Sequence, residues 1–234
     1  CERLIEVGND MADNQLLGWG VLGLGRIKQR SGLIDEALAH LQEVLETFQA
    51  IPDYPGNVDT LGEMGFCYLR QNKPQEARLV LEEAHRIIKE QNVMGSQILV
   101  AYSGLAEAYL ILAEQANDVQ EEKRWTKKAK RACRTALKQS KRCRPWLPHS
   151  LRMQGRFQCL TGKEKAAQKW WQRSRDIAQH MGMRYELGMT HLEIGKYLQD
   201  QVHLEQAEAI FSDIGAKLDL ARARELLSEE KNKI

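Results

Sequence analysis

Apolar residues recur along this chain at the spacing of one helix face, in paired segments that short polar turns separate. The first segment of a pair carries a large residue, then a small one, then another large one three positions later, as in Met64, Gly65 and Tyr68. The second segment carries an alanine followed four positions later by an apolar residue, as in Ala77 and Leu81. This pattern predicts helical hairpins rather than strands.

The alanine of the second segment repeats five times along the chain. The steps between successive alanines are 40, 52, 38 and 40 residues. These five anchor alanines are Ala37, Ala77, Ala129, Ala167 and Ala207. One hairpin cannot bury its apolar face alone, whereas stacked neighbours can, so a repeat at this period indicates an array. The sequence therefore predicts an all-α, helical-hairpin solenoid of about five repeats.

The pattern also predicts where each part of the array begins and ends. We expect one domain over 1–234, which is a fragment of a longer protein, and a capping helix over 217–231. The stretch 1–9 resembles the end of a preceding repeat. The predicted repeats span 10–50, 56–92, 96–142, 146–180 and 184–214.

This pattern resembles the tetratricopeptide repeat, whose first helix carries Leu-Gly and then Tyr and whose second carries Ala and an aromatic residue. Beyond the anchor alanines, the matching positions are Leu24, Gly25, Gly65, Tyr68, Tyr102, Leu105, Tyr109, Gly195 and Phe211. The chain departs from the pattern at Lys28, Gln158 and His191, and its period is nearer 40 than the roughly 34 residues of that family.

The C-terminal stretches 182–195 and 209–223 resemble the end of large bacterial signalling proteins. Those proteins join an adenylate or guanylate cyclase, a kinase or a LuxR-type domain to an AAA/STAND ATPase and then to repeats. The resemblance implies a regulatory arm whose partners include an upstream domain of the same polypeptide. A second possibility is that the chain is part of a cyclase or ATPase whose catalytic domain lies upstream.

The resemblance to tetratricopeptide arrays implies a concave groove lined by first-helix residues. Carried over, the predicted protein-binding groove residues are Arg26, Arg30, Asp59, Phe66, Arg70, Ser103, Glu107, Arg152, Arg156 and Lys196. Arginine binds carboxylates through paired hydrogen bonds, so this groove favours an acidic peptide or partner domain. We therefore expect a protein-interaction and regulatory sensor module.

The second helix of the third unit is unusually basic. Residues 123–144 contain 11 Lys and Arg and no acidic residue. The predicted basic patch consists of Lys127, Lys128, Arg131, Arg134 and Lys138. Residues 1–118 have a net charge of −9 (9 basic, 18 acidic), and residues 119–234 a net charge of +11 (25 basic, 14 acidic). Three interpretations remain open: a solvated outer face, a surface for an acidic protein, and a binding site for nucleic acid or an anionic surface.

The sequence contains none of the common catalytic motifs. There is no GxxxxGK[ST], HExxH or GxSxG, and the glycines at 18–25 lie in a helical pattern without a preceding strand. The six histidines are scattered, which is typical of surface or packing residues. The five cysteines form no CxxC pair, and no apolar stretch approaches the length of a membrane span. We expect no enzyme activity in this chain, no cofactor or metal, reduced thiols and a cytoplasmic location.

Overall fold

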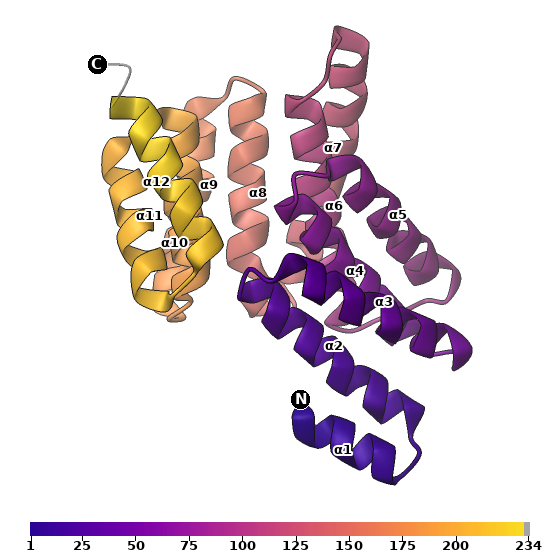
Figure 1. Ribbon diagram of the computed structural model, residues 1–234. Helices are drawn as coiled ribbons and strands as arrows, with labels where there is room; N and C mark the ends of the chain where they lie inside the picture. The colour runs from indigo at the N-terminus through magenta and orange to yellow at the C-terminus, as the bar shows by residue number, and fades with distance from the viewer. Residues whose placement is uncertain (232–234) are drawn as a thin grey trace. The chain divides into compact units, whose positions relative to one another are not determined.

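The computed structural model describes residues 1–231, and over this range the chain is all α-helical, as predicted (Figure 1). A short 3₁₀ turn at Arg144–Trp146 precedes α8. The helices are α1 (Glu2–Asp10), α2 (Asn14–Arg30), α3 (Ile34–Ala50), α4 (Tyr54–Arg70), α5 (Pro74–Glu90), α6 (Gln97–Glu114), α7 (Val119–Ser140), α8 (Leu147–Leu160), α9 (Glu164–His180), α10 (Arg184–Leu198), α11 (Gln201–Ile214) and α12 (Lys217–Lys231).

The chain forms two compact units, Cys1–Ala132 and Cys133–Ile234. In the first unit, α1 packs on α2, the hairpins α2–α3 and α4–α5 follow, and α4 also contacts α2 and α6. In the second unit, α8–α9 and α10–α11 are hairpins, α10 contacts α8 and α9, and α12 packs on α11. The division between the units falls within α7.

Short turns with a left-handed residue close several of the hairpins. Gly32 and Gly162 occupy this position with φ of 82° and 71°, and Asn72 does so with φ of 56°. Glycine and asparagine tolerate this conformation better than other residues, so each turn ends one helix and reverses the chain within three residues.

Helices of one hairpin approach closely where a glycine faces a large side chain. A Cβ added to Gly65 would lie 2.5 Å from Leu81 Cγ, and one added to Gly155 would lie 2.5 Å from Trp171 Nε1. The five anchor alanines are fully buried. The small residues in the repeat pattern therefore set the distance between the paired helices, while the large residues fill the space beside them.

The 52-residue step in the repeat has a structural counterpart in α7. Ala129 is the eleventh residue of this helix, whereas Ala77 is the fourth residue of α5, so α7 begins two turns earlier than its equivalents. The connection 91–96 between α5 and α6 is also three residues longer than the turn 71–73. The extra length is thus divided mainly between a loop and a helix.

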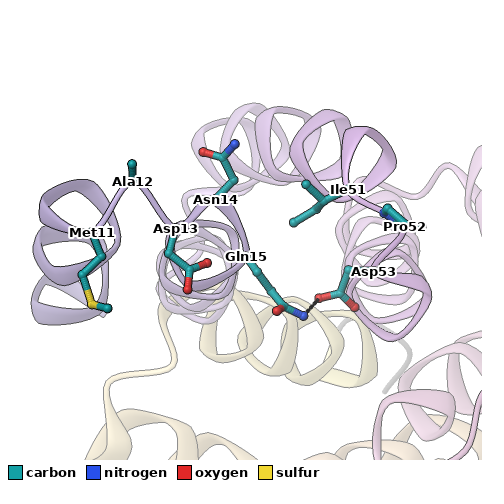
Figure 2. Close-up of a pocket in the computed structure, with 8 residues that line it drawn as sticks. All are labelled: Met11, Ala12, Asp13, Asn14, Gln15, Ile51, Pro52 and Asp53. Carbon is teal, nitrogen blue, oxygen red and sulfur yellow. Dashed lines mark hydrogen bonds between the residues drawn. The ribbon is translucent and has the colours of Figure 1, made fainter.

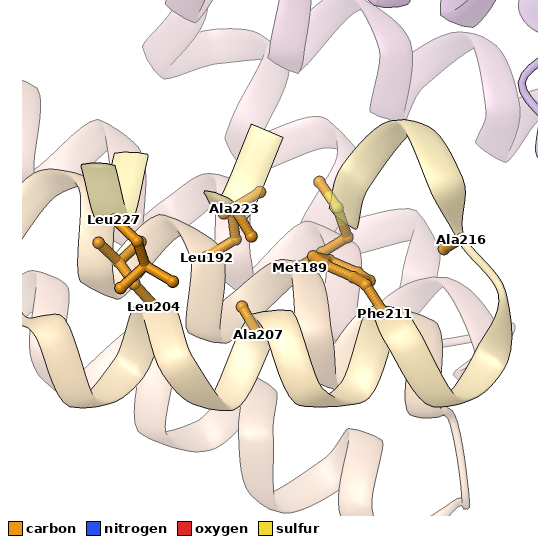
Figure 3. Packing of buried hydrophobic residues seen from close by; sticks show 8 residues of the cluster. All are labelled: Met189, Leu192, Leu204, Ala207, Phe211, Ala216, Ala223 and Leu227. Carbon is orange, nitrogen blue, oxygen red and sulfur yellow. The ribbon is translucent and has the colours of Figure 1, made fainter. Parts of the chain in front are cut away.

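The last hairpin is closed by α12, as predicted for a capping helix (Figure 3). Met189 and Leu192 of α10 and Phe211 of α11 form an apolar cluster with Ala223 and Leu227 of α12. Phe211 and Ala223 are fully buried. The cluster gives the last hairpin the apolar neighbour that a further repeat would otherwise supply.

No helix among the described residues has the length and apolar character needed to cross a bilayer.

Substituting Gly65 by alanine tests the close approach of α4 and α5. The new methyl group overlaps Leu81, so we expect the free energy of unfolding to fall by about 1–2 kcal/mol, despite the better helix propensity of alanine. Urea unfolding followed by circular dichroism measures this loss. Leu81→Ala should cost less in the Gly65→Ala background than in the parent chain, and strictly additive losses would contradict the proposed contact.

Candidate functional site

An ion-pair network links the first helices of the first unit. Arg26 of α2 pairs with Asp59 of α4, and its Nε lies 2.8 Å from Oε1 of Glu63. Gln29 Nε2 donates to the other carboxylate oxygen of Glu63 at 3.2 Å. Burial raises the pKa of Asp59 to about 6, although Arg26 acts in the opposite direction. The charge of Arg26 is thus already balanced within the chain.

A second network joins α8 and α10 in the second unit. Arg152 Nη1 lies 2.8 Å from Glu193 Oε1, and Arg152 Nη2 lies 3.5 Å from Glu186 Oε2. Trp171 Nε1 donates to Glu193 Oε2 at 3.3 Å. Arg152 and Glu193 are both buried. Because a buried charge requires a partner, this pair ties the two first helices together.

The ten predicted groove residues therefore differ in how accessible they are. Arg30 and Lys196 are exposed, while Phe66, Arg70 and Glu107 are half-buried. Ser103 is fully buried, and Arg156 is buried with its guanidinium 5.6 Å from the centre of the Tyr197 ring. The structure joins Arg26 to Asp59, and it engages Arg152 with carboxylates that were not among the predicted residues. Peptide binding by the groove stays a prediction.

The predicted basic patch lies along α7, and one of its five members is engaged by the chain itself. Lys128 Nζ lies 2.8 Å from Glu82 Oε1, which also accepts a hydrogen bond from Tyr109 Oη at 2.6 Å. Arg78 Nη1 lies 2.7 Å from the other oxygen. Partial burial acts to raise the pKa of Glu82, but Lys128, Tyr109 and Arg78 together have a larger effect in the opposite direction. The pKa of Glu82 is therefore lowered overall.

The other four members of the patch, Lys127, Arg131, Arg134 and Lys138, are exposed. Within residues 1–231, no carboxylate lies at ion-pair distance from any of them. Like charges four residues apart on a helix destabilise it by a few tenths of a kcal/mol per pair, to order of magnitude. Lys127–Arg131 and Arg134–Lys138 are such pairs. The described chain thus carries this repulsion without any compensating contact.

Sequence reasoning missed a histidine pair in the last hairpin. His191 of α10 and His203 of α11 lie with their Nδ1 atoms 3.0 Å apart, and Arg175 Nη1 lies 3.4 Å from His203 Nε2. Burial, then His203 and Arg175, lower the pKa of His191 to about 4. The expectation of isolated histidines was wrong here, because the pairing depends on the hairpin register. The departure of His191 from the repeat pattern was the one available signal.

The described residues contain no cluster of three or more side chains suited to a metal ion. The cysteines are free thiols, and burial raises the pKa of Cys67 and Cys133 to about 12. Neither thiol has the depressed pKa of a reactive cysteine.

An open pocket of about 600 Å³ lies between residues 11–15, at the start of α2, and the turn 51–53 in the first unit (Figure 2). Its Asp53 caps α4 by accepting from Gly56 N at 2.8 Å. The other oxygen of Asp53 accepts from Gln15 Nε2 at 2.9 Å and Trp19 Nε1 at 3.1 Å. The second carboxylate that lines this pocket, Asp13, caps α2 by accepting from Leu16 N at 3.0 Å, so both carboxylates are used for structure.

Comparison with known proteins supports the repeat architecture. Residues 19–90, which include most of α2 and all of α3, α4 and α5, match a family model described as Tetratricopeptide repeat. The search of curated proteins gave no match.

Several solved structures resemble the chain. A thermophilic TPR protein from Thermus thermophilus, TTC0263, is 19% identical with a TM-score of 0.59, covering 88% of this chain and 98% of its own. BtubC (BKLC) from P. vanneervenii is 16% identical with a TM-score of 0.61, covering 99% of this chain and 87% of its own. A putative kinesin light chain with TPR-like repeats from Podosopora anserina is 19% identical with a TM-score of 0.50, covering 83% and 95%. These likenesses show that the chain has the fold of a tetratricopeptide-type helical array.

Replacing Arg152 by methionine tests the buried network of the second unit. The substitution leaves Glu193 buried without its cation, so we expect the free energy of unfolding to fall by about 3–5 kcal/mol in urea unfolding. Adding Glu193→Gln removes the orphaned charge and should recover part of this loss. A loss below about 1 kcal/mol would show that water solvates the Glu193 carboxylate in the variant. The Arg152–Glu193 pair would then contribute little to the stability of the fold.

The histidine pair predicts a dependence of stability on pH. The pKa of His191 is depressed in the folded state, so below its ordinary value of 6.5 the unfolded chain binds a proton that the folded chain does not. Stability should be complete above pH 6.5 and decrease toward pH 4, with a loss of about 2 kcal/mol between pH 7.5 and pH 5. His191→Gln should reduce this loss in urea unfolding at the two pH values. An identical pH dependence in the variant would rule out His191 as its source.

Proposed function

We propose that this chain is a non-catalytic protein-binding module that recognises an acidic polypeptide segment on its first-helix face. Tetratricopeptide repeats generally mediate protein–protein interaction, and stacked helix pairs provide extended surfaces for it. The observation that carries the proposal is the position of two arginines in the first unit. Arg30 is the last residue of α2, and Arg70 occupies the same place in α4, the next first helix.

The surroundings of these arginines suit the recognition of a carboxylate. First helices of consecutive hairpins run in the same direction, and α2 contacts α4, so both arginines belong to the same end of this face. Arg30 is exposed and, among the described residues, has no ion-pair partner. The Arg26 network beneath holds α2 and α4 in a fixed relation, which reduces the ordering cost of binding. Half-buried Phe66 of α4 offers apolar surface to the same ligand.

Selection from a phage-displayed random 12-residue peptide library tests this proposal. We expect the selected peptides to be rich in Asp and Glu, and Arg30→Glu to weaken their binding at least tenfold in calorimetry, about 1.4 kcal/mol. Lys169→Glu, an equal charge change on the exposed face of α9, serves as the control and should leave affinity unchanged. Peptides without acidic enrichment, or peptides insensitive to Arg30→Glu, would contradict the proposed site.

We further propose that the module is the regulatory arm of a larger signalling protein, as the resemblance of its C-terminal stretch implies. The support is the sequence resemblance alone. An upstream reading frame that encodes a P-loop ATPase with an effector domain would agree with this proposal, and one that encodes only more repeats would contradict it. Purified chain should show no nucleotide hydrolysis, and turnover that disappears on mutation within the chain would disprove the non-catalytic role.

A further inference from the structure

The outer face of α7 carries a continuous row of cations, which we call the basic stripe. Its spacings of three and four residues place its members on one face of the helix. The opposite face is buried, at Trp125 and Ala129. All members of the stripe are exposed. They are Lys123, Lys127, Lys130 and Arg131, all in the first unit.

The stripe differs from the other charged helices because the described chain provides no acids for it. On α5, Arg78 pairs with Glu82, and Arg86 pairs with Glu83 and Glu90, all at spacings of three or four. On α7 the last acidic residue is Glu122, one position before the stripe begins. None of the four stripe cations has an ion-pair partner within residues 1–231. A row of like charges without counter-charges is an electrostatic footprint for an anionic partner.

The edge of the stripe shows which anion this helix can hold. Lys128, one position after Lys127, binds the carboxylate of Glu82 together with Arg78 and Tyr109. The chain itself thus provides an example of a glutamate from a neighbouring helix bound to the side of α7. Other glutamates, on a helix laid along the stripe, would meet Lys and Arg side chains of the same chemistry.

The surroundings of the stripe favour a protein partner over a nucleic acid. Single-stranded nucleic acids are bound by stacking bases on exposed aromatic rings, and Trp125, the aromatic residue of α7, is buried. Lys and Arg also attract the phosphates of a duplex, so duplex DNA is the competing ligand in the test of this surface. A second α-helix, with the same rise of about 1.5 Å per residue, can follow the row over about 12 Å from Lys123 to Arg131.

We propose that the basic stripe is a second docking surface, specific for an acidic α-helix of another protein with Glu or Asp at spacings of three and four residues. This surface lies on a second helix and does not include the first-helix residues of the proposed groove. The two binding activities should therefore be separable by mutation.

Fluorescence anisotropy with a labelled 22-residue alanine-based helical peptide tests this proposal. The probe carries glutamates along one face, and a comparison peptide of the same composition distributes them around the helix. We expect the one-faced peptide to bind more tightly, with affinity that falls steeply as salt rises. Equal binding of the two peptides would show only general attraction to anions and would overturn the proposal.

The double variant Lys127→Glu/Arg131→Glu locates the surface. It should weaken binding of the one-faced peptide at least tenfold. The matched control is Lys165→Glu/Lys169→Glu on α9, an exposed pair with the same spacing on another second helix, which should change binding less than twofold. Arg30→Glu should have no effect, so failure of the groove proposal would leave this one intact. Circular dichroism confirms that each variant is folded.

A 20-base-pair DNA duplex provides the competing outcome. We expect the duplex to bind more weakly than the one-faced peptide at the same salt concentration. If the duplex binds more tightly and Lys127→Glu/Arg131→Glu abolishes that binding, the stripe is a nucleic-acid site and the protein-docking proposal is wrong. Peptide binding that survives the double variant would also overturn it.

Discussion

The close contact between a glycine of the first helix and a large side chain of the second helix is the constraint on which the hairpins depend. At Gly65 there is no room for a methyl group beside Leu81, and at Gly155 there is none beside Trp171. Close packing of this kind leaves few voids and fixes the distance between helix axes. Once that distance is set, the first helices of neighbouring hairpins lie near enough for side chains such as Arg26 and Glu63 to meet.

The same arrangement explains why Arg26 and Arg152, two of the first-helix arginines, are already paired with carboxylates of the chain. Arg26 and Arg152 connect neighbouring first helices through carboxylates of α4 and α10. These ion pairs balance charges that would otherwise be buried without a partner when the helices stack. The proposed recognition of an acidic segment uses the exposed Arg30, at the end of a helix that the ion pairs hold in place. In this proposal, structural and binding roles are divided among residues of one type.

The charges of α7, the second helix of the third repeat, are not balanced in the way that those of α5 are. On α5 the charges of Arg78 and Arg86 are matched by nearby glutamates, so that surface is nearly self-neutral. On α7 the outer cations have no counterpart in the described chain, and the helix is longer than its equivalents. The helix α7 departs from its repeat in both length and charge, which is why we propose for it a function that the other repeats lack.

The sequence by itself determined the all-α helical-repeat array, because the spacing of apolar and small residues is a local property that each helix repeats. It also indicated the basic face of α7, since charges three and four residues apart share a face wherever the helix lies. Only the tertiary structure decided which charges are neutralised. The pairing of Arg26 with Asp59 and of His191 with His203 joins residues 33 and 12 positions apart, and depends on how the helices stack. The repeat period of the sequence does not show which distant residues pair, because their side chains meet only after the glycine contacts have set the spacing of the helices.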